Sequence, residues 1–181
     1  MDAEQGSLIL QNADLIYDEI YCQEKLVQIA DEISHVLHNS FPLVLCIMGG
    51  AVVFTGRLLP LLFFPLEFDY IHVTRYQKEL SGGQFKWFKC PGEEVIQQRT
   101  VLILDDILDE GHTLFEAKSR VLELGAKKCY TAVFAQKDLA IQKLIQADFV
   151  GLNVPNRYVF GYGMDVKGYW RNLPAIYALK E

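Results

Sequence analysis

The chain has 181 residues, of which 51% are hydrophobic and 22% are charged. This balance excludes a disordered, collagenous or coiled-coil protein, and the length favours one domain whose core needs neither disulfides nor a structural metal. The net charge of −6 argues against general nucleic-acid binding. An anionic ligand would therefore have to be held by local donors or by metal ions.

The four cysteines, Cys22, Cys46, Cys90 and Cys129, are far apart and form no CxxC pair. We therefore expect no zinc site and no disulfide framework, and we predict a reducing, cytoplasmic location. The longest apolar run, residues 58–66, contains two prolines and is far shorter than the roughly 20 residues of a membrane span. The first ten residues lack the basic region of a signal peptide, so no membrane partner is expected.

The hydrophobic pattern predicts an alternation of helices and strands. Helices are predicted where apolar residues recur at helical spacing: 22–39, 51–59, 113–124 and a short one at 140–145. Strands are predicted at short apolar or alternating runs: 43–47, 66–73, 100–104, 129–134 and 149–154. This order favours an α/β fold, a mainly parallel twisted sheet flanked by helices.

The pattern fails between Thr74 and Arg99, where Ser81-Gly82-Gly83 and Pro91-Gly92 are turn signals. A long irregular segment inside a compact domain is often a functional loop. Residues 84–88 could instead form one arm of a hairpin. The aromatic and basic residues there could also mark a subunit contact.

The most informative run is Val101 to Leu114. A buried strand is followed by Asp105 and Asp106, and then by Asp109 and a Gly111-x-Thr113 sequence at a helix start. Open α/β sheets bind ligands at the carboxyl ends of their strands, and the N-terminus of a helix attracts phosphate. A sugar phosphate would use both features: the carboxylates for its hydroxyl groups and the N–H groups at the helix start for its phosphate. Taken alone, the acids could also be solvated, with one of them capping the helix.

This run resembles the phosphoribosyl pyrophosphate (PRPP) motif of type I phosphoribosyltransferases, and the chain is most similar to the hypoxanthine-guanine members. Three further segments occur in the matching order: Ile47–Gly50, Ala135–Lys137 and Tyr158–Tyr162. The resemblance implies a single domain over 1–181, with a flexible active-site loop at about 74–99. It also implies a small hood over the base site, formed by about 1–20 and 155–181.

The resemblance implies a purine salvage enzyme. It would transfer the 5-phosphoribosyl group of PRPP to hypoxanthine or guanine, giving IMP or GMP and pyrophosphate. Mg²⁺ is the implied cofactor, and a homodimer or homotetramer is the implied assembly. Two alternatives stay open: a regulatory protein of the same fold that senses PRPP or nucleotides, and an enzyme for another base, such as xanthine or a pyrimidine.

The resemblance also assigns roles to residues. Asp109 corresponds to the general base, and Asp105, Asp106 and Asp165 to metal-binding acids. The implied PRPP-binding residues are Asp105, Asp106, Asp109, Glu110, Gly111, His112 and Thr113. Pyrophosphate contacts are implied for Met48, Gly49 and Arg171, base contacts for Lys137, Tyr158, Val159 and Asp165, and loop residues for Arg75 and Tyr76.

Two positions depart from the family pattern. Met48 stands where many purine members have a lysine, and Arg75 stands where they usually have a serine. The first change removes a cation from the implied pyrophosphate site, which leaves backbone N–H groups to serve there. A lysine such as Lys137 would, without this context, more often be a solvated surface charge, and Tyr158 would more often be a core residue.

Overall fold

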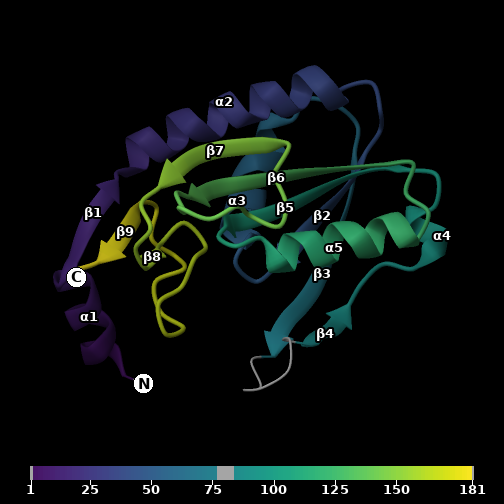
Figure 1. Ribbon diagram of the computed structural model, residues 1–181. Coiled ribbons are helices and arrows are strands. Elements are labelled where there is room, and N and C mark those ends of the chain that lie inside the picture. The colour runs from purple at the N-terminus through teal and green to yellow at the C-terminus, as the bar shows by residue number, and fades with distance from the viewer. Residues whose placement is uncertain (1, 77–83, 181) are drawn as a thin grey trace.

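The computed structural model describes residues 2–76 and 84–180. Its main sheet has six strands in the order β4-β3-β2-β5-β6-β7 (Figure 1). Their bounds are β2 Leu43–Met48, β3 Glu67–Tyr76, β4 Gln84–Lys89, β5 Thr100–Leu108, β6 Lys128–Lys137 and β7 Phe149–Val154. Neighbouring strands are parallel except for the β3–β4 pair. The predicted α/β fold with a mainly parallel sheet is confirmed.

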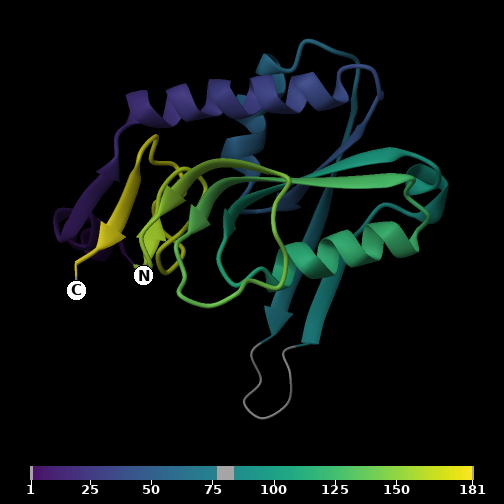
Figure 2. The same ribbon diagram turned by 45° about the horizontal axis from the view of Figure 1, so that its top comes forward.

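Helices cover both faces of this sheet. On one face lie α2 (Glu19–Leu37) and α3 (Val52–Leu58), which continues into a 3-10 turn, η1 (Leu59–Leu61). On the other face lie α5 (His112–Glu123) and the short α4 (Glu93–Ile96), as Figures 1 and 2 show. Among the described residues, no helix is both long enough and apolar enough to cross a membrane.

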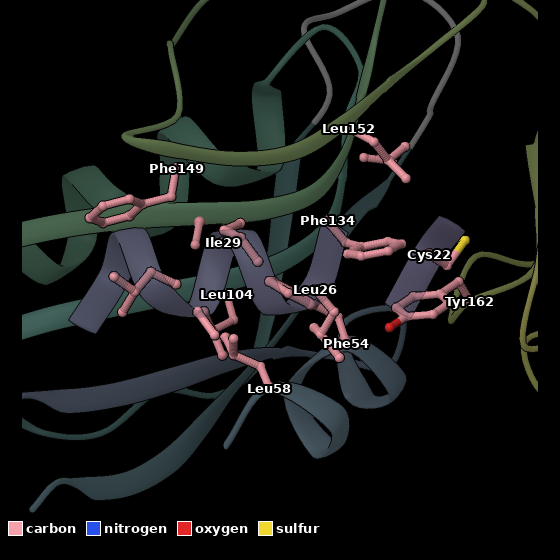
Figure 3. Close-up of a cluster of buried hydrophobic side chains, with 14 of the residues drawn as sticks. Cys22, Leu26, Ile29, Phe54, Leu58, Leu104, Phe134, Phe149, Leu152 and Tyr162 are labelled. Atoms are coloured by element: carbon pink, nitrogen blue, oxygen red, sulfur yellow. The ribbon is translucent and has the colours of Figure 1, made fainter. Parts of the chain in front are cut away.

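The core is divided by the sheet into two layers. In the layer shown in Figure 3, Leu26 and Ile29 of α2 meet Phe54 and Leu58 of α3 over Leu104 of β5. The opposite layer packs α5 against the other side chains of the same strands. Because β2 and β5 are buried on both faces, they are continuous apolar runs in the sequence.

Strands β5 and β6 are longer than predicted. The sequence pattern ended the first of them at Leu104, before the acids, but β5 continues through Asp105 and Asp106 to Leu108. Its pairing with β6 also continues, to Leu108↔Gln136, which extends β6 to Lys137. The partner strand pairs with Asp105 and again with Ile107 and Leu108, so the backbone stays extended after the apolar run has ended.

The helix predicted at 140–145 is wrong, because this stretch has no regular secondary structure. Its polar groups make tertiary hydrogen bonds instead. The backbone N–H of Leu144 donates to the carbonyl of Glu110 over 3.1 Å, and the Lys143 side chain donates to other backbone carbonyls. Ile141 and Leu144, two of the apolar residues that suggested a buried helix face, are exposed.

The segment predicted as a flexible loop at about 74–99 is largely regular. β3 extends to Tyr76, β4 covers Gln84–Lys89, and α4 follows at Glu93–Ile96. The two strands pair antiparallel from His72↔Lys89 to Tyr76↔Gln84, so residues 84–88 do form one arm of a hairpin. The turn signal Ser81-Gly82-Gly83 lies outside the described residues.

The two ends of the chain form a second, three-stranded sheet in the order β1-β9-β8. Its strands are β1 Ala13–Tyr17, β8 Val159–Phe160 and β9 Ile176–Leu179, and helix α1 (Ala3–Gln11) precedes them. Arg157 ties this sheet together, because its guanidinium donates to Asp14 over 2.6 Å and to the carbonyl of Leu179 over 2.7 Å.

Gly161 is expected to be essential for the loop that follows β8. Its φ is +94°, and a Cβ there would overlap the carbonyl oxygen of Ala175. Gly161→Ala should therefore cost at least about 2 kcal/mol of unfolding free energy, from the combined backbone and steric strain. Urea unfolding followed by circular dichroism measures this loss of unfolding free energy.

Gly56→Ala is the matched control. Gly56 is exposed within α3, and a Cβ there would meet nothing within 4 Å. Alanine should stabilise this helix by about 0.5–1 kcal/mol, the opposite sign. Equal effects of the two substitutions would contradict the tight contact at Gly161.

Candidate active site

The predicted site residues gather at the carboxyl ends of β2, β5 and β6. The chain crosses from β2 outward to β3 and from β5 outward to β6, so strand order reverses between β2 and β5. Ligands of open α/β sheets bind at such a point. A cavity of about 450 Å³ lies there, lined by Arg75 and by the continuous run from Asp105 to Leu114.

Asp105 and Asp106 form the acidic wall of this cavity. Asp105 is only 7% exposed, and its carboxylate accepts the backbone N–H of Asp106 over 3.0 Å. The Asp106 carboxylate lies directly against Gly50, where any Cβ would overlap it. Gly50, just after the end of β2, is therefore needed for the acid to fit.

The acidic pair is electrostatically strained. Burial, together with the negative charge of Asp106, raises the pKa of Asp105 well above its ordinary value. Burial also raises the pKa of Asp106, although hydrogen bonds and the nearby Arg171 partly oppose this. The pair therefore attracts cations and hydrogen-bond donors.

The opposite wall is the turn from Asp109 to the start of α5. Gly111 has φ +92°, and helix α5 begins directly after it at His112. The first N–H groups of a helix have no partner within the helix, so those of His112 and Thr113 can meet an anion at the cavity. The Glu110 carboxylate lies 3.0 Å from His112 Nε2 and 3.8 Å from Arg75.

A second cavity of about 210 Å³ adjoins the first and shares Asp106, Ile107 and Asp109 with it. Its remaining lining residues are Lys137, Tyr158, Val159, Met164 and Asp165. Lys137 Nζ donates to Asp109 Oδ2 over 2.6 Å, so an ion pair lies at the boundary between the two cavities.

The C-terminal part of the chain closes the smaller cavity. Arg171 pairs with Asp165 at 2.5 Å and donates to the carbonyl of Gly163 over 2.8 Å. Tyr158 is 54% exposed, so it is no core residue. Burial, with the charge of Asp165, raises the pKa of Tyr158, and its hydroxyl stays neutral at pH 7.

Most of the predicted residues thus line one continuous site. The residues predicted to contact pyrophosphate, Met48, Gly49 and Arg171, are the exception. Met48 and Gly49 are not among the lining residues of these two cavities. Met48 Sδ instead accepts from the Cys46 thiol at 3.8 Å. Arg171 reaches the site through Asp165, and Gly50 reaches it through Asp106. The Tyr76 side chain lies outside the described residues.

Sequence reasoning missed five contributors. Leu108 and Leu114 line the larger cavity, Met164 lines the smaller one, and Ile107 lines both. Lys143 lines neither, but its side chain donates to the carbonyl of Asp109. Ile107 lies between two predicted acids and could have been found from its position in the strand. No local pattern points to Lys143, because its contacts depend on a long irregular connection.

The carboxylates suit a magnesium ion. Mg²⁺ prefers oxygen ligands and is often held by one or two carboxylates together with substrate phosphates. Asp105 and Asp106 offer such a pair, at a place where negative charge is poorly compensated. Within residues 2–76 and 84–180, no group of three acidic, histidine or cysteine side chains is arranged to hold a metal unaided.

Comparison with known proteins agrees with this arrangement. The family model of the phosphoribosyl transferase domain matches residues 16–167. A hypoxanthine-guanine-xanthine phosphoribosyltransferase from Tritrichomonas foetus is 31% identical over 168 residues, covering 92% of this chain and 91% of the relative. A hypoxanthine-guanine phosphoribosyltransferase from Bacillus subtilis is 32% identical over 167 residues, covering 92% of both.

A solved structure supports the same conclusion. A mutant of the hypoxanthine phosphoribosyltransferase from Trypanosoma cruzi, in a ternary complex with substrates, superposes with a TM-score of 0.83. It is 26% identical, and the match covers 94% of this chain and 97% of that one. With the fold, the motif and the two adjoining cavities in agreement, this chain belongs to the phosphoribosyltransferase family.

Proposed function

We propose that this protein transfers the 5-phosphoribosyl group of PRPP to hypoxanthine or guanine, releasing pyrophosphate, as a purine salvage enzyme. The observation that carries the proposal is the pair of cavities with a common wall. One cavity offers acids and helix N–H groups for a sugar phosphate, and the other offers an aromatic ring and a lysine for a base. A reaction that joins two ligands needs such neighbouring compartments.

The smaller cavity suits a 6-oxopurine. Lys137 has donors only, so it complements an oxo group and not an amino group. Tyr158 supplies an exposed aromatic ring on which a base can stack. Asp109, beside Lys137, is the acceptor that would take a proton from the purine ring.

The larger cavity suits the polyanionic ligand. Arg75 is the cationic side chain among its described lining residues, and Glu110 lies close to both Arg75 and His112. Arg75 thus offers a cation at the position where the family has serine. We also propose Mg²⁺ as cofactor, held by Asp105 and Asp106, where it would supply positive charge against the departing pyrophosphate.

The regulatory alternative is not favoured, because the relatives and the solved structure described above all carry phosphoribosyltransferase names. We keep the proposal of a cytoplasmic location, since all four cysteines are free thiols.

A panel of bases tests this function. With PRPP and Mg²⁺, we expect nucleotide and pyrophosphate from hypoxanthine or guanine, and no product from adenine, since Lys137 cannot accept from its amino group. Uracil in the same panel tests the pyrimidine alternative. Chromatography of the nucleotides measures the outcome, and xanthine completes the panel. PRPP binding without turnover of any base would instead identify a PRPP-sensing protein.

Asp109→Asn tests the proposed general base. Asparagine keeps the size of the side chain but cannot take a proton, so single-turnover rates should fall about 10²- to 10⁴-fold while PRPP binding is largely kept. Asp138→Asn, an exposed neighbour of Lys137 that lines neither cavity, is the control and should stay near the wild-type rate. Rapid turnover by Asp109→Asn would remove this role.

Asp105→Asn should stabilise the ligand-free protein at pH 7 while it impairs turnover. The pKa of Asp105 is raised in the folded state by burial and by Asp106, so this carboxyl favours folding when protonated. That contribution is present below its unfolded pKa of about 3.9 and is lost as pH rises through the folded value. The gain in Tm should therefore be largest near neutrality and should shrink toward a pH of about 3.5.

Thermal unfolding between about pH 3.5 and pH 8 measures this effect. Asp31→Asn is the control for the loss of one negative charge, because Asp31 is exposed on α2. A lower Tm for Asp105→Asn at pH 7, with Asp31→Asn unchanged, would mean that the carboxylate stabilises the free fold.

A further inference from the structure

Lys143 makes an unusual set of contacts for a lysine in an irregular connection. Its Nζ lies 2.6 Å from the carbonyl oxygen of Lys137, 2.8 Å from that of Asp109 and 3.5 Å from that of Leu108. An ammonium group has three N–H donors, and here three backbone acceptors surround it. Lys143 is therefore no solvated surface charge.

These carbonyls lie where two neighbouring strands end. The ladder between β5 and β6 finishes with Leu108↔Gln136, and the carbonyls of Asp109 and Lys137 come directly after it. Beyond this point, no ladder bond holds the two backbones at a fixed separation. The ammonium of Lys143 bridges them instead.

The two residues after Lys143 brace the same turn. The N–H of Leu144 donates to the carbonyl of Glu110 over 3.1 Å, and Ile145 Cγ2 would lie 2.9 Å from a Cβ added to Gly111. Residues 143–145 thus contact Asp109, Glu110 and Gly111 in register. Of these three residues, Lys143 also donates to β6, at the carbonyl of Lys137.

The contact with both strands matters because of the side chains on these residues. Asp109 and Lys137 face each other at 2.6 Å on the boundary between the cavities, while their carbonyls point to Lys143. Lys143 itself lines neither cavity. Its direct hydrogen bonds to these two residues are therefore with their backbone.

We propose that Lys143 is a positioning residue for the reaction: its ammonium, shared among three carbonyls, sets the distance between Asp109 and Lys137 and so aligns both with the base. The inference rests on the proposed function. Burial lowers the pKa of Lys143, while the charges of Asp109 and Asp138 oppose this. The backbone carbonyls offset the cost of burying the charge.

Lys143→Met tests the proposal, since it removes the ammonium and keeps an unbranched side chain. The matched control is Lys118→Met. Lys118 anchors the other end of the same connection, at Asp148 Oδ2 over 3.3 Å, and touches neither Asp109 nor Lys137. Steady-state kinetics with PRPP and hypoxanthine gives kcat and both KM values, and thermal unfolding gives the stability of each variant.

Misplacing reacting groups by about 1 Å can cost 10²-fold, so kcat/KM for hypoxanthine should fall about 10- to 100-fold in Lys143→Met, with KM for PRPP within about threefold. Lys118→Met should keep both values, even if its Tm falls equally. Unchanged kinetics in Lys143→Met, equal losses in both variants, or a loss confined to PRPP would each overturn the positioning role. If Lys143→Met does not fold, Lys143→Gln, which keeps a donor, is judged by the same criteria.

Turnover by the wild type distinguishes a failure of the proposed function from a failure of the positioning role of Lys143. A wild type without turnover of any base would overturn the proposed function and this inference with it. An active wild type alongside an unimpaired Lys143→Met would overturn the inference alone.

Discussion

The ladder between β5 and β6, which continues beyond the apolar core, is the constraint on which the site depends. It pairs Asp105 with Val133, resumes at Ile107 and ends with Leu108 opposite Gln136, so both acids lie in extended backbone near the carboxyl end of β5. The next residue after Leu108 and the next after Gln136 are Asp109 and Lys137, which pair at 2.6 Å. One hydrogen-bonding register thus places Asp105 and Asp106 in the larger cavity. The same register places Asp109 and Lys137 at the boundary between the two cavities.

The same register imposes a cost in the free protein. It buries Asp105 and places the Asp106 carboxylate against Gly50. Burial disfavours the charge of both carboxylates, and repulsion by Asp106 adds to the cost at Asp105. A fold selected only for stability would place apolar or neutral side chains there. The cation and the sugar hydroxyls that we propose as ligands would offset this cost when they bind.

The sequence predicted several strands and the contiguous part of the site well. β2 was readable because burial on both faces gives an uninterrupted apolar run. β7, at the edge of the sheet, was readable because it is a short and mostly apolar run, in which Phe149, Leu152 and Val154 are buried. The segment from Asp105 to Thr113 was readable because its cavity is lined by consecutive residues. Local information is sufficient in both cases.

The errors arose where tertiary contacts decide the backbone. Asp105 and Asp106 are poor strand formers that stay extended because β6 pairs with Asp105 and, beyond Asp106, with Ile107. Residues 140–145 carry apolar residues at helical spacing, but their polar groups bind the carbonyls of Asp109, Glu110 and Lys137. The pairing of Arg171 with Asp165 likewise depends on a loop that no periodicity describes.

The small terminal sheet has a consequence for the order in which the protein is built. Its middle strand, β9, pairs with β1 on one side, where Leu179 lies opposite Ala13, and with β8 on the other side. During synthesis, residues 13–17 must wait for almost the whole chain before their partner exists, and such distant pairings form slowly. The main sheet and the turn from Asp109 to Thr113 can assemble earlier, from residues 43–154. A growing chain can therefore complete the walls of the larger cavity well before residues 158–165, which line the smaller one, are in place.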